Sequence, residues 1–205
     1  MDKDKVADFA ASNRILISRI TFSAVLFFLL FTASSWEGRA VGLTFEILGF
    51  VFIVIGGLGR IWSGVYIYGY KTKKLITTGP YAMVRNPLYF FSFFGALGAG
   101  LASRNLIVLA IIMLFFVIYY PWVVIHEENK LARRHPEAYK KYKKKVPRFI
   151  PRFNALEEPE LYEVKVKKYR SVFLDVMWFF WLFAILRIIN VLHQMGVMPV
   201  LFEIP

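Results

Sequence analysis

The chain has 205 residues, of which 58% are hydrophobic. That fraction exceeds the roughly one half found in an ordinary soluble domain, so the composition excludes a typical soluble protein. Cysteine is absent, which excludes disulfides, thiolate metal sites and a cysteine nucleophile. The net charge of +12 suits either nucleic acid or an anionic membrane face, and the long apolar runs decide for the membrane and against nucleic acid.

Five apolar stretches follow one another along the chain, and spanning a bilayer takes about 20 such residues. They cover residues 15–33, 41–68, 88–102, 106–125 and 172–192. The third reaches only about 22 Å, at about 1.5 Å per residue. Because three residues separate it from the fourth, we predict a tight helical hairpin from these two. The sequence predicts one all-α domain, a polytopic integral membrane protein with about five transmembrane helices.

The basic residues alternate between the predicted loops. Going along the chain, the loops and ends hold 4, 1, 4, 1, 14 and 0 of them. By the positive-inside rule the amino terminus is cytoplasmic, as are segments 69–87 and 126–171, and the carboxyl terminus is outside. The charged start leads us to expect no cleavable signal peptide.

A short helix is predicted within the second of these segments, in the stretch "HPEAYKKYKKK". Pro136 stands at a first helical position, Glu137 follows in the first turn, and lysines fill the last turn. Tyr139 and Tyr142 are three residues apart and so share one face of that helix. Residues 152–171 are predicted to form a charged connector, and residues 172–195 an additional transmembrane helix.

Both cytoplasmic segments carry polar and aromatic side chains that packing alone does not require. They are Tyr81, Arg85, Asn86 and Tyr89 in the first segment, and Glu127, Glu128, Tyr139, Tyr142 and Arg148 in the second. An arginine and a carboxylate from separate segments can hold the two ends of an amino-acid zwitterion. Tyrosine rings can stack on a purine or face a cation. We therefore treat the two segments as one predicted site.

No metal site is expected from the sequence. His126 is followed by two glutamates, but the residue four positions on is Lys130, so a zinc-protease motif is missing. The three histidines are too few for a multi-histidine di-iron site. Arg60 and Arg187 lie inside predicted membrane helices, where a charge is costly and is a functional candidate. Snorkelling or a structural ion pair is the alternative for each of them.

Two stretches in order, "GPYAMVRNPLY" and "EENKLARRHPEAYKKYKKKVPRFIP", resemble a paired signature. It is that of the isoprenylcysteine carboxyl methyltransferase and phospholipid methyltransferase superfamily. The resemblance covers roughly residues 43–151. It implies a methyl transfer from S-adenosylmethionine, bound at the cytoplasmic face, to a lipid or lipid-linked acceptor that enters between the helices.

The resemblance also implies roles for particular residues. The cofactor-binding set is Gly79, Tyr81, Arg85, Asn86, Pro87, Tyr89, Glu127, Glu128, Tyr139 and Tyr142. Within it Glu128, or Glu127, takes the cofactor ammonium, and the turn at residues 85–87 takes the carboxylate. We assign Arg60 and Arg148 as catalytic candidates that orient an anionic acceptor.

Two alternatives to the methyltransferase stay open, and the first of them rests on a departure from the signature. Asn86 stands where the family has a histidine, and asparagine cannot become cationic. A scaffold that kept the fold and lost the chemistry is therefore one alternative. The other is an NADPH-dependent membrane reductase of the sterol and steroid type, which shares a Pro-x-Tyr and a terminal basic segment. The paired glutamates at 127 and 128 favour the methyltransferase.

Overall fold

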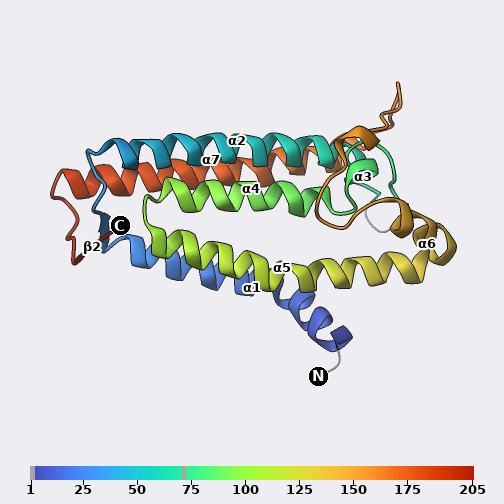
Figure 1. The fold of residues 1–205 in the computed structure, drawn as a ribbon, viewed down its shortest axis with the longest axis horizontal. Coiled ribbons are helices and arrows are strands. Elements are labelled where there is room, and N and C mark those ends of the chain that lie inside the picture. Colours follow the sequence, from blue (N-terminus) through green and yellow to red (C-terminus); the bar gives the residue numbers. More distant parts are fainter. Residues whose placement is uncertain (1–2, 71–72) are drawn as a thin grey trace.

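The computed structural model describes residues 3–70 and 73–205. Figure 1 shows long helices running side by side, with the short helices gathered at one end of the molecule, here named the α6 end. The helices are α1 (Lys3–Leu29), α2 (Ala40–Ile67), α3 (Pro80–Met83), α4 (Pro87–Ala102), α5 (Leu106–Arg134), α6 (Pro136–Lys145) and α7 (Val166–Gln194), with one 3-10 turn, η1 (Phe153–Ala155).

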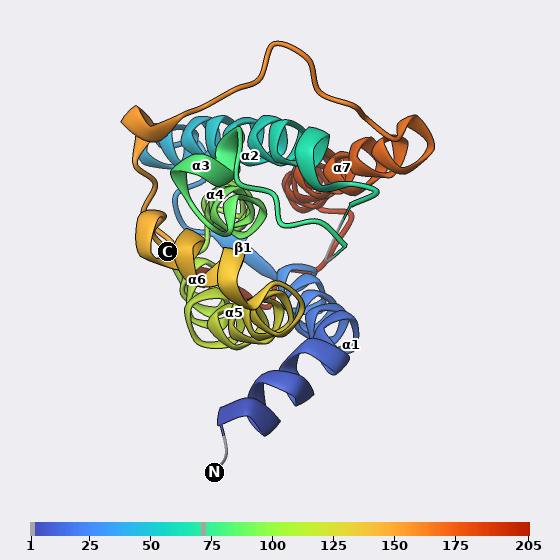
Figure 2. The same cartoon turned by 90° about the vertical axis from the view of Figure 1, so that its right-hand side faces the viewer.

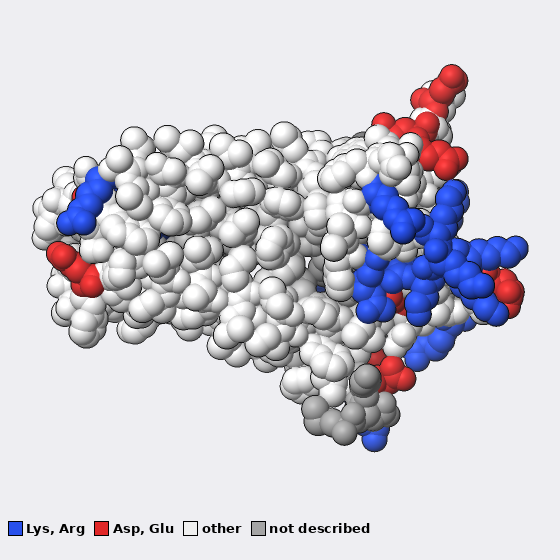
Figure 3. Space-filling model, in the orientation of Figure 1, with Lys and Arg blue, Asp and Glu red and all other residues white. Residues whose placement is uncertain are grey.

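Four helices of the described chain are long and apolar enough to cross a membrane, namely α1, α2, α5 and α7, while α4 is apolar but shorter. Large apolar side chains on their outer faces are exposed, among them Leu58, Leu114 and Trp181. On the face drawn in Figure 3, lysine and arginine gather at the α6 end, and a broad band without charge covers the middle of the molecule. The prediction of a helical, polytopic membrane protein is confirmed, and the five predicted spans correspond to four long helices and one short one.

Several helices differ in length from the prediction. Helix α1 begins at Lys3, well before the predicted residue 15, and α5 continues past residue 125 to Arg134. The extension of α5 contains good helix formers, and the helix ends at Arg134 because His135 precedes Pro136, and the residue before a proline is disfavoured in the α region. Helices α4 and α5 are joined by three residues and form the predicted hairpin.

A small parallel sheet was missed by the all-α prediction. Strand β1 (Thr32–Ser34) pairs with β2 (Phe202–Ile204), which joins the end of α1 to the carboxyl-terminal segment. In addition, the amide of Leu106 donates to the carbonyl of Pro205 over 2.8 Å. The last residues of the chain therefore close the end of the molecule opposite to α6.

Helices α2 and α4 pack backbone against backbone through small residues. A Cβ on Gly56 would lie 2.5 Å from the amide nitrogen of Gly95, and one on Gly98 would lie 2.6 Å from the carbonyl of Gly49. Such small residues are typical of close helix contacts in membranes. Figure 2 shows α4 between α2 and α5, with α7 beside α2 and α1 beside α5. This arrangement brings α1, α4, α5 and α7 around one interhelical space.

Candidate functional site

The predicted site residues separate into two groups on different faces of α5. Consecutive residues of a helix point about 100° apart, since there are about 3.6 residues per turn. Glu128 accordingly faces the loops around α3 and α6. Glu127 faces α1 instead, where its carboxylate pairs with Arg14 at 3.2 Å.

The first group is centred on the Glu128 carboxylate, whose side chain is only 6% exposed. Its Oε1 accepts a 2.9 Å hydrogen bond from Asn86 Nδ2 and lies 3.2 Å from Arg85 Nε. Its Oε2 accepts from Arg148 Nε at 3.1 Å and from Arg148 Nη2 at 2.8 Å. We refer to Arg85, Asn86, Glu128 and Arg148 as the Glu128 cluster. Charge-assisted bonds of this kind are among the strongest in proteins, and here two cations share one anion.

The backbone brings these four residues together from two distant segments. Pro80 and Pro87 each stand at the first position of a helix, where a missing amide costs nothing, so residues 84–86 form a sharp connection between α3 and α4. The amide of Arg85 donates to the Pro147 carbonyl at 2.9 Å, and the amide of Arg152 donates to the Met83 carbonyl at 3.0 Å. The segment after α6 is thereby attached to the α3–α4 connection.

Two buried tyrosines of α6 cover the cluster. The Tyr142 hydroxyl donates to the carbonyl of Tyr81 at 2.7 Å. The hydroxyls of Tyr139 and Tyr81 are also buried, but they find no hydrogen-bond partner among the described residues. Burial raises the pKa of Tyr139, and the nearby Glu128 carboxylate raises it further. Burial and the neighbouring Tyr139 likewise raise the pKa of Tyr142, so both phenols stay neutral at ordinary pH.

Gly79 lies apart from this cluster, beneath the connector. It has a positive φ of 61°, and a Cβ there would lie 2.3 Å from Cζ of Tyr66. Its amide donates to the carbonyl of Glu157 at 2.7 Å. Glu158 Oε1 accepts from Trp62 Nε1 at 2.9 Å and from the Tyr66 hydroxyl at 3.1 Å. The Glu158 carboxylate therefore attaches the predicted connector to α2, and the Glu157 carbonyl attaches it to Gly79. Neither contact was predicted from the sequence.

The second group lines spaces between the helices. Arg60 Nη1 donates to Ser92 Oγ at 2.5 Å, and the guanidinium lies 5.8 Å from the ring centre of Phe179. Arg60 and Arg148, the two candidates predicted to orient an anionic acceptor, therefore have different surroundings, since Arg148 pairs with Glu128. Arg187 takes the alternative of a structural pair, since it lies 2.8 Å from Glu46.

Three adjoining cavities lie between the helices, two of them lined by Arg60, and we refer to the three together as the interhelical cavity. The first has a volume of 640 Å³ and is lined by charged and aromatic residues, among them Arg14, Arg19, Arg60, Tyr68, Tyr89, Glu127 and Asp175. The second, of 600 Å³, shares Arg19, Arg60, Ser92 and Asp175 with the first. The third, of 210 Å³, is almost wholly apolar. Neither Arg19 nor Asp175 was predicted as a site residue, and Asp175 was predicted to be structural, although each is a charge within an apolar helix, which marks a functional candidate.

Tyr81 is buried and packs with Tyr66 and Ile76. Its carbonyl accepts a hydrogen bond from the Tyr142 hydroxyl. Burial raises the pKa of the Tyr81 hydroxyl well above the ordinary value. Tyr142 and Glu127 raise this pKa further, and Arg60 lowers it. Two predicted residues close to it take different places. Pro87 begins α4, and Tyr89 lines the cavity.

Acidic, histidine and cysteine side chains do not gather into a metal-binding group of three or more within the described ranges.

Comparison with known proteins identifies the family. Residues 18–138 match the sequence pattern of the family described as phospholipid methyltransferase. The chain belongs to the phospholipid methyltransferase family. The matched region begins before the predicted core of residues 43–151 and ends inside it.

Three curated proteins resemble this member of the phospholipid methyltransferase family. The cobalt-zinc-cadmium resistance protein CzcN of Cupriavidus metallidurans is 32% identical over 93% of this chain and 88% of its own length. The nickel-cobalt-cadmium resistance protein NccN of Alcaligenes xylosoxydans xylosoxydans is 30% identical over 96% of this chain and 92% of its own length. The protein-S-isoprenylcysteine O-methyltransferase of Schizosaccharomyces pombe is 33% identical over 40% of this chain and 34% of its own length. No solved structure matches the chain.

Proposed function

We propose that this family member transfers a methyl group from S-adenosylmethionine to a lipid or lipid-linked acceptor. In this proposal α4 crosses the membrane with the four long helices, and the amino terminus and the α6 end are cytoplasmic. The observation that carries it is the Glu128 cluster, in which the two signature segments meet around one buried carboxylate. Membership of the family supports the same reaction.

The residues of the cluster fit the amino-acid end of S-adenosylmethionine. Glu128 offers a carboxylate for its ammonium group, and Arg85 and the Asn86 amide offer donors for its carboxylate. The hydroxyls of Tyr81 and Tyr139, buried without partners among the described residues, offer further hydrogen bonds. Both aromatic rings suit the adenosine or the sulfonium cation.

Binding requires one of the present partners of Glu128 to leave it. The Arg148 side chain is 37% exposed, whereas that of Arg85 is 7% exposed, so Arg148 is the partner that exchanges. S-adenosylmethionine supplies an activated methyl group when bound, and the protein contributes mostly positioning and exclusion of water. Arg85, Asn86 and Glu128 do the positioning on the cofactor side, and the interhelical cavity receives the acceptor.

Calorimetric titration of the detergent-solubilised protein with S-adenosylmethionine tests the proposal. We expect micromolar binding, weakened by about 2–5 kcal/mol in Glu128→Gln, as for a truncated buried charge contact. Glu127→Gln is the matched control, because the same change is made on the face that pairs with Arg14. Equal affinity of the wild type and Glu128→Gln would remove Glu128 from the cofactor site. Binding of NADPH in place of S-adenosylmethionine would favour the reductase.

One observation favours a scaffold as the second candidate. Both oxygens of Glu128 already have partners, so the cluster is complete as a structural tie between α4, α5 and the segment after α6. Labelled methyl donor and membrane lipid extracts separate the two functions. Incorporation of label into lipid supports the methyltransferase, while binding of S-adenosylmethionine without turnover on any extract supports the scaffold.

The two resistance proteins suggest a physiological setting. We propose that this chain also acts in cells exposed to toxic divalent metals such as cobalt and cadmium. A metal-sensitive host that expresses either the wild type or Glu128→Gln tests this. If only the wild type raises metal tolerance, the role in metal resistance depends on the Glu128 cluster. If both proteins give equal tolerance, that role does not depend on the cluster.

A further inference from the structure

The interhelical cavity contains more guanidinium groups than carboxylates. Its polar part is lined by Arg14, Arg19, Arg60, Glu127 and Asp175. Arg14 is paired with Glu127 at 3.2 Å, and the Asp175 carboxylate accepts a 2.8 Å hydrogen bond from the Tyr68 hydroxyl. One positive charge is therefore left over within this part of the cavity.

Of the three arginines that line this part of the cavity, Arg14 is paired, and Arg60 and Arg19 are the two without an anionic partner among the described residues. Neither forms an ion pair within the described part of the chain. Arg60 has one hydrogen bond, to Ser92, and its Nε is buried without a partner in the described ranges. An arginine at membrane depth is costly unless an anion or water accompanies it. The guanidinium of Arg60 thus indicates a negatively charged ligand.

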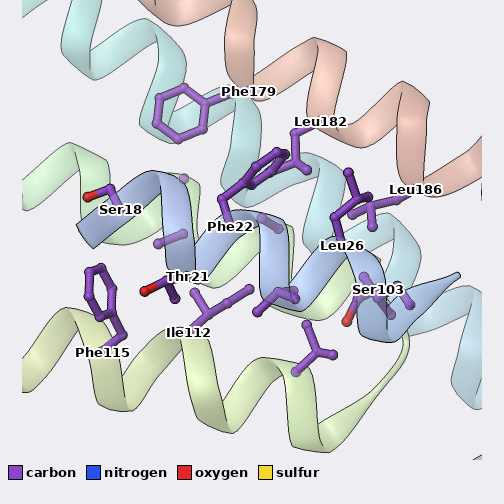
Figure 4. Close-up of a pocket in the computed structure, with 16 residues that line it drawn as sticks. Ser18, Thr21, Phe22, Leu26, Ser103, Ile112, Phe115, Phe179, Leu182 and Leu186 are labelled. Carbon is purple, nitrogen blue, oxygen red and sulfur yellow. The ribbon is translucent and has the colours of Figure 1, made fainter. Parts of the chain in front are cut away.

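The opposite end of the cavity is apolar and suits a hydrocarbon chain. The 600 Å³ space that contains Arg60 shares Phe22, Phe115, Phe179 and Leu182 with the 210 Å³ apolar space beyond it. Figure 4 shows side chains of α1, α5 and α7 converging on that space, among them Phe22, Leu26, Ile112, Phe115, Leu182 and Leu186. The cavity therefore runs from a cationic end to an apolar end.

We propose that the interhelical cavity binds an amphiphile with a singly charged oxyanion head group, held by Arg60 and Arg19, and with its hydrocarbon chain between α1, α5 and α7. If the proposed function holds, this amphiphile is the methyl acceptor, and only that part of the proposal rests on the proposed function. A cationic amine head group fits poorly, because it would meet the surplus positive charge of the cavity.

Binding of three probes with the same chain tests the proposal in detergent, without S-adenosylmethionine. The probes are oleate, oleyl alcohol and oleylamine. We expect oleate to bind at least tenfold more tightly than oleylamine. Arg60→Gln lowers the affinity for oleate at least tenfold and leaves that for oleyl alcohol unchanged, whereas Arg60→Lys retains the preference for oleate. Leu182→Trp fills the apolar end and weakens all three probes.

Arg187→Gln is the matched control, since Arg187 is also an arginine within a membrane helix but is paired with Glu46 and lies outside the cavity lining. It should leave oleate binding unchanged. Equal oleate affinity in the wild type and Arg60→Gln, or preference for oleylamine, would overturn the proposal. Replacing oleate by phosphatidylglycerol distinguishes a free carboxylate from an anionic phospholipid, and binding of neither also overturns it. Because S-adenosylmethionine is left out, failure of the cofactor assay does not affect this outcome.

Discussion

Replacing Glu128 by glutamine should strongly destabilise the protein. Glutamine keeps the shape of the side chain but removes the charge that balances two arginines, and the Arg85 side chain is only 7% exposed. Removing one partner of a buried ion pair costs about 3–5 kcal/mol, because the other charge stays buried. In a protein of this size 1 kcal/mol shifts Tm by roughly 2–4 °C, so the expected fall in Tm is roughly 6–20 °C.

Replacing Arg148 by glutamine should cost clearly less. Glu128 keeps Arg85 and Asn86 as partners, and the Arg148 side chain is 37% exposed, so water already screens its charge. We expect a loss of about 1–2 kcal/mol, as for a hydrogen bond to a charged group. Glu127→Gln serves as a control, since its pair with Arg14 is more exposed and is worth about 1 kcal/mol or less.

Thermal unfolding followed by intrinsic tryptophan fluorescence provides the measurement. The chain has five tryptophans, and thiol-reactive dyes have no target because cysteine is absent. The double variant Glu128→Gln with Arg85→Gln should lose less stability than the sum of its two single variants, because the buried unpaired charge is gone. A fall in Tm for Glu128→Gln no larger than that for Arg148→Gln would refute the assignment of Arg85 as the buried charge.

Three other predictions concern packing and the tyrosines. Gly56→Val should destabilise the α2–α4 contact by at least 2 kcal/mol, roughly the cost of overpacking a close contact. The reason is that its Cβ would lie 2.5 Å from the Gly95 nitrogen. The control is Leu58→Ala at an exposed position of the same helix, which should change Tm much less. Tyr142→Phe should lower the free energy of unfolding by about 1–3 kcal/mol, because the buried Tyr81 carbonyl loses its donor. Tyr139→Phe should leave that free energy unchanged, since the Tyr139 hydroxyl has no partner in the described ranges. It should still lower the affinity for S-adenosylmethionine. Both tyrosines have a higher pKa in the folded protein than the value of about 10 expected in the unfolded chain. Their contribution to stability is therefore complete below about pH 10 and is lost as the pH rises above that value. Alkaline unfolding should therefore be weaker in the Tyr139→Phe and Tyr142→Phe double variant, and an identical pH profile would contradict the role of burial.

The membrane helices could be predicted because their cause is local. The length of an apolar run sets whether a helix can cross a bilayer, and that length is written in the sequence. Helix α6 was predicted for the same kind of reason, since Pro136 and the lysines of its last turn mark both ends. The strand pair at the opposite end was not predicted, because β1 and β2 are far apart in the sequence: Thr32 pairs with Phe202. The two strands stabilise one another only after the helices between them have folded.

The sequence by itself determined that this protein is a helical membrane protein and which two segments carry its polar residues. Only the tertiary structure decided how those residues are grouped. Glu127 and Glu128 are neighbours in the chain, yet one faces Arg14 of α1 and the other faces Arg85 and Arg148. Each step along a helix turns the side chain by about 100°, so which neighbour it meets depends on helices that come from distant parts of the chain.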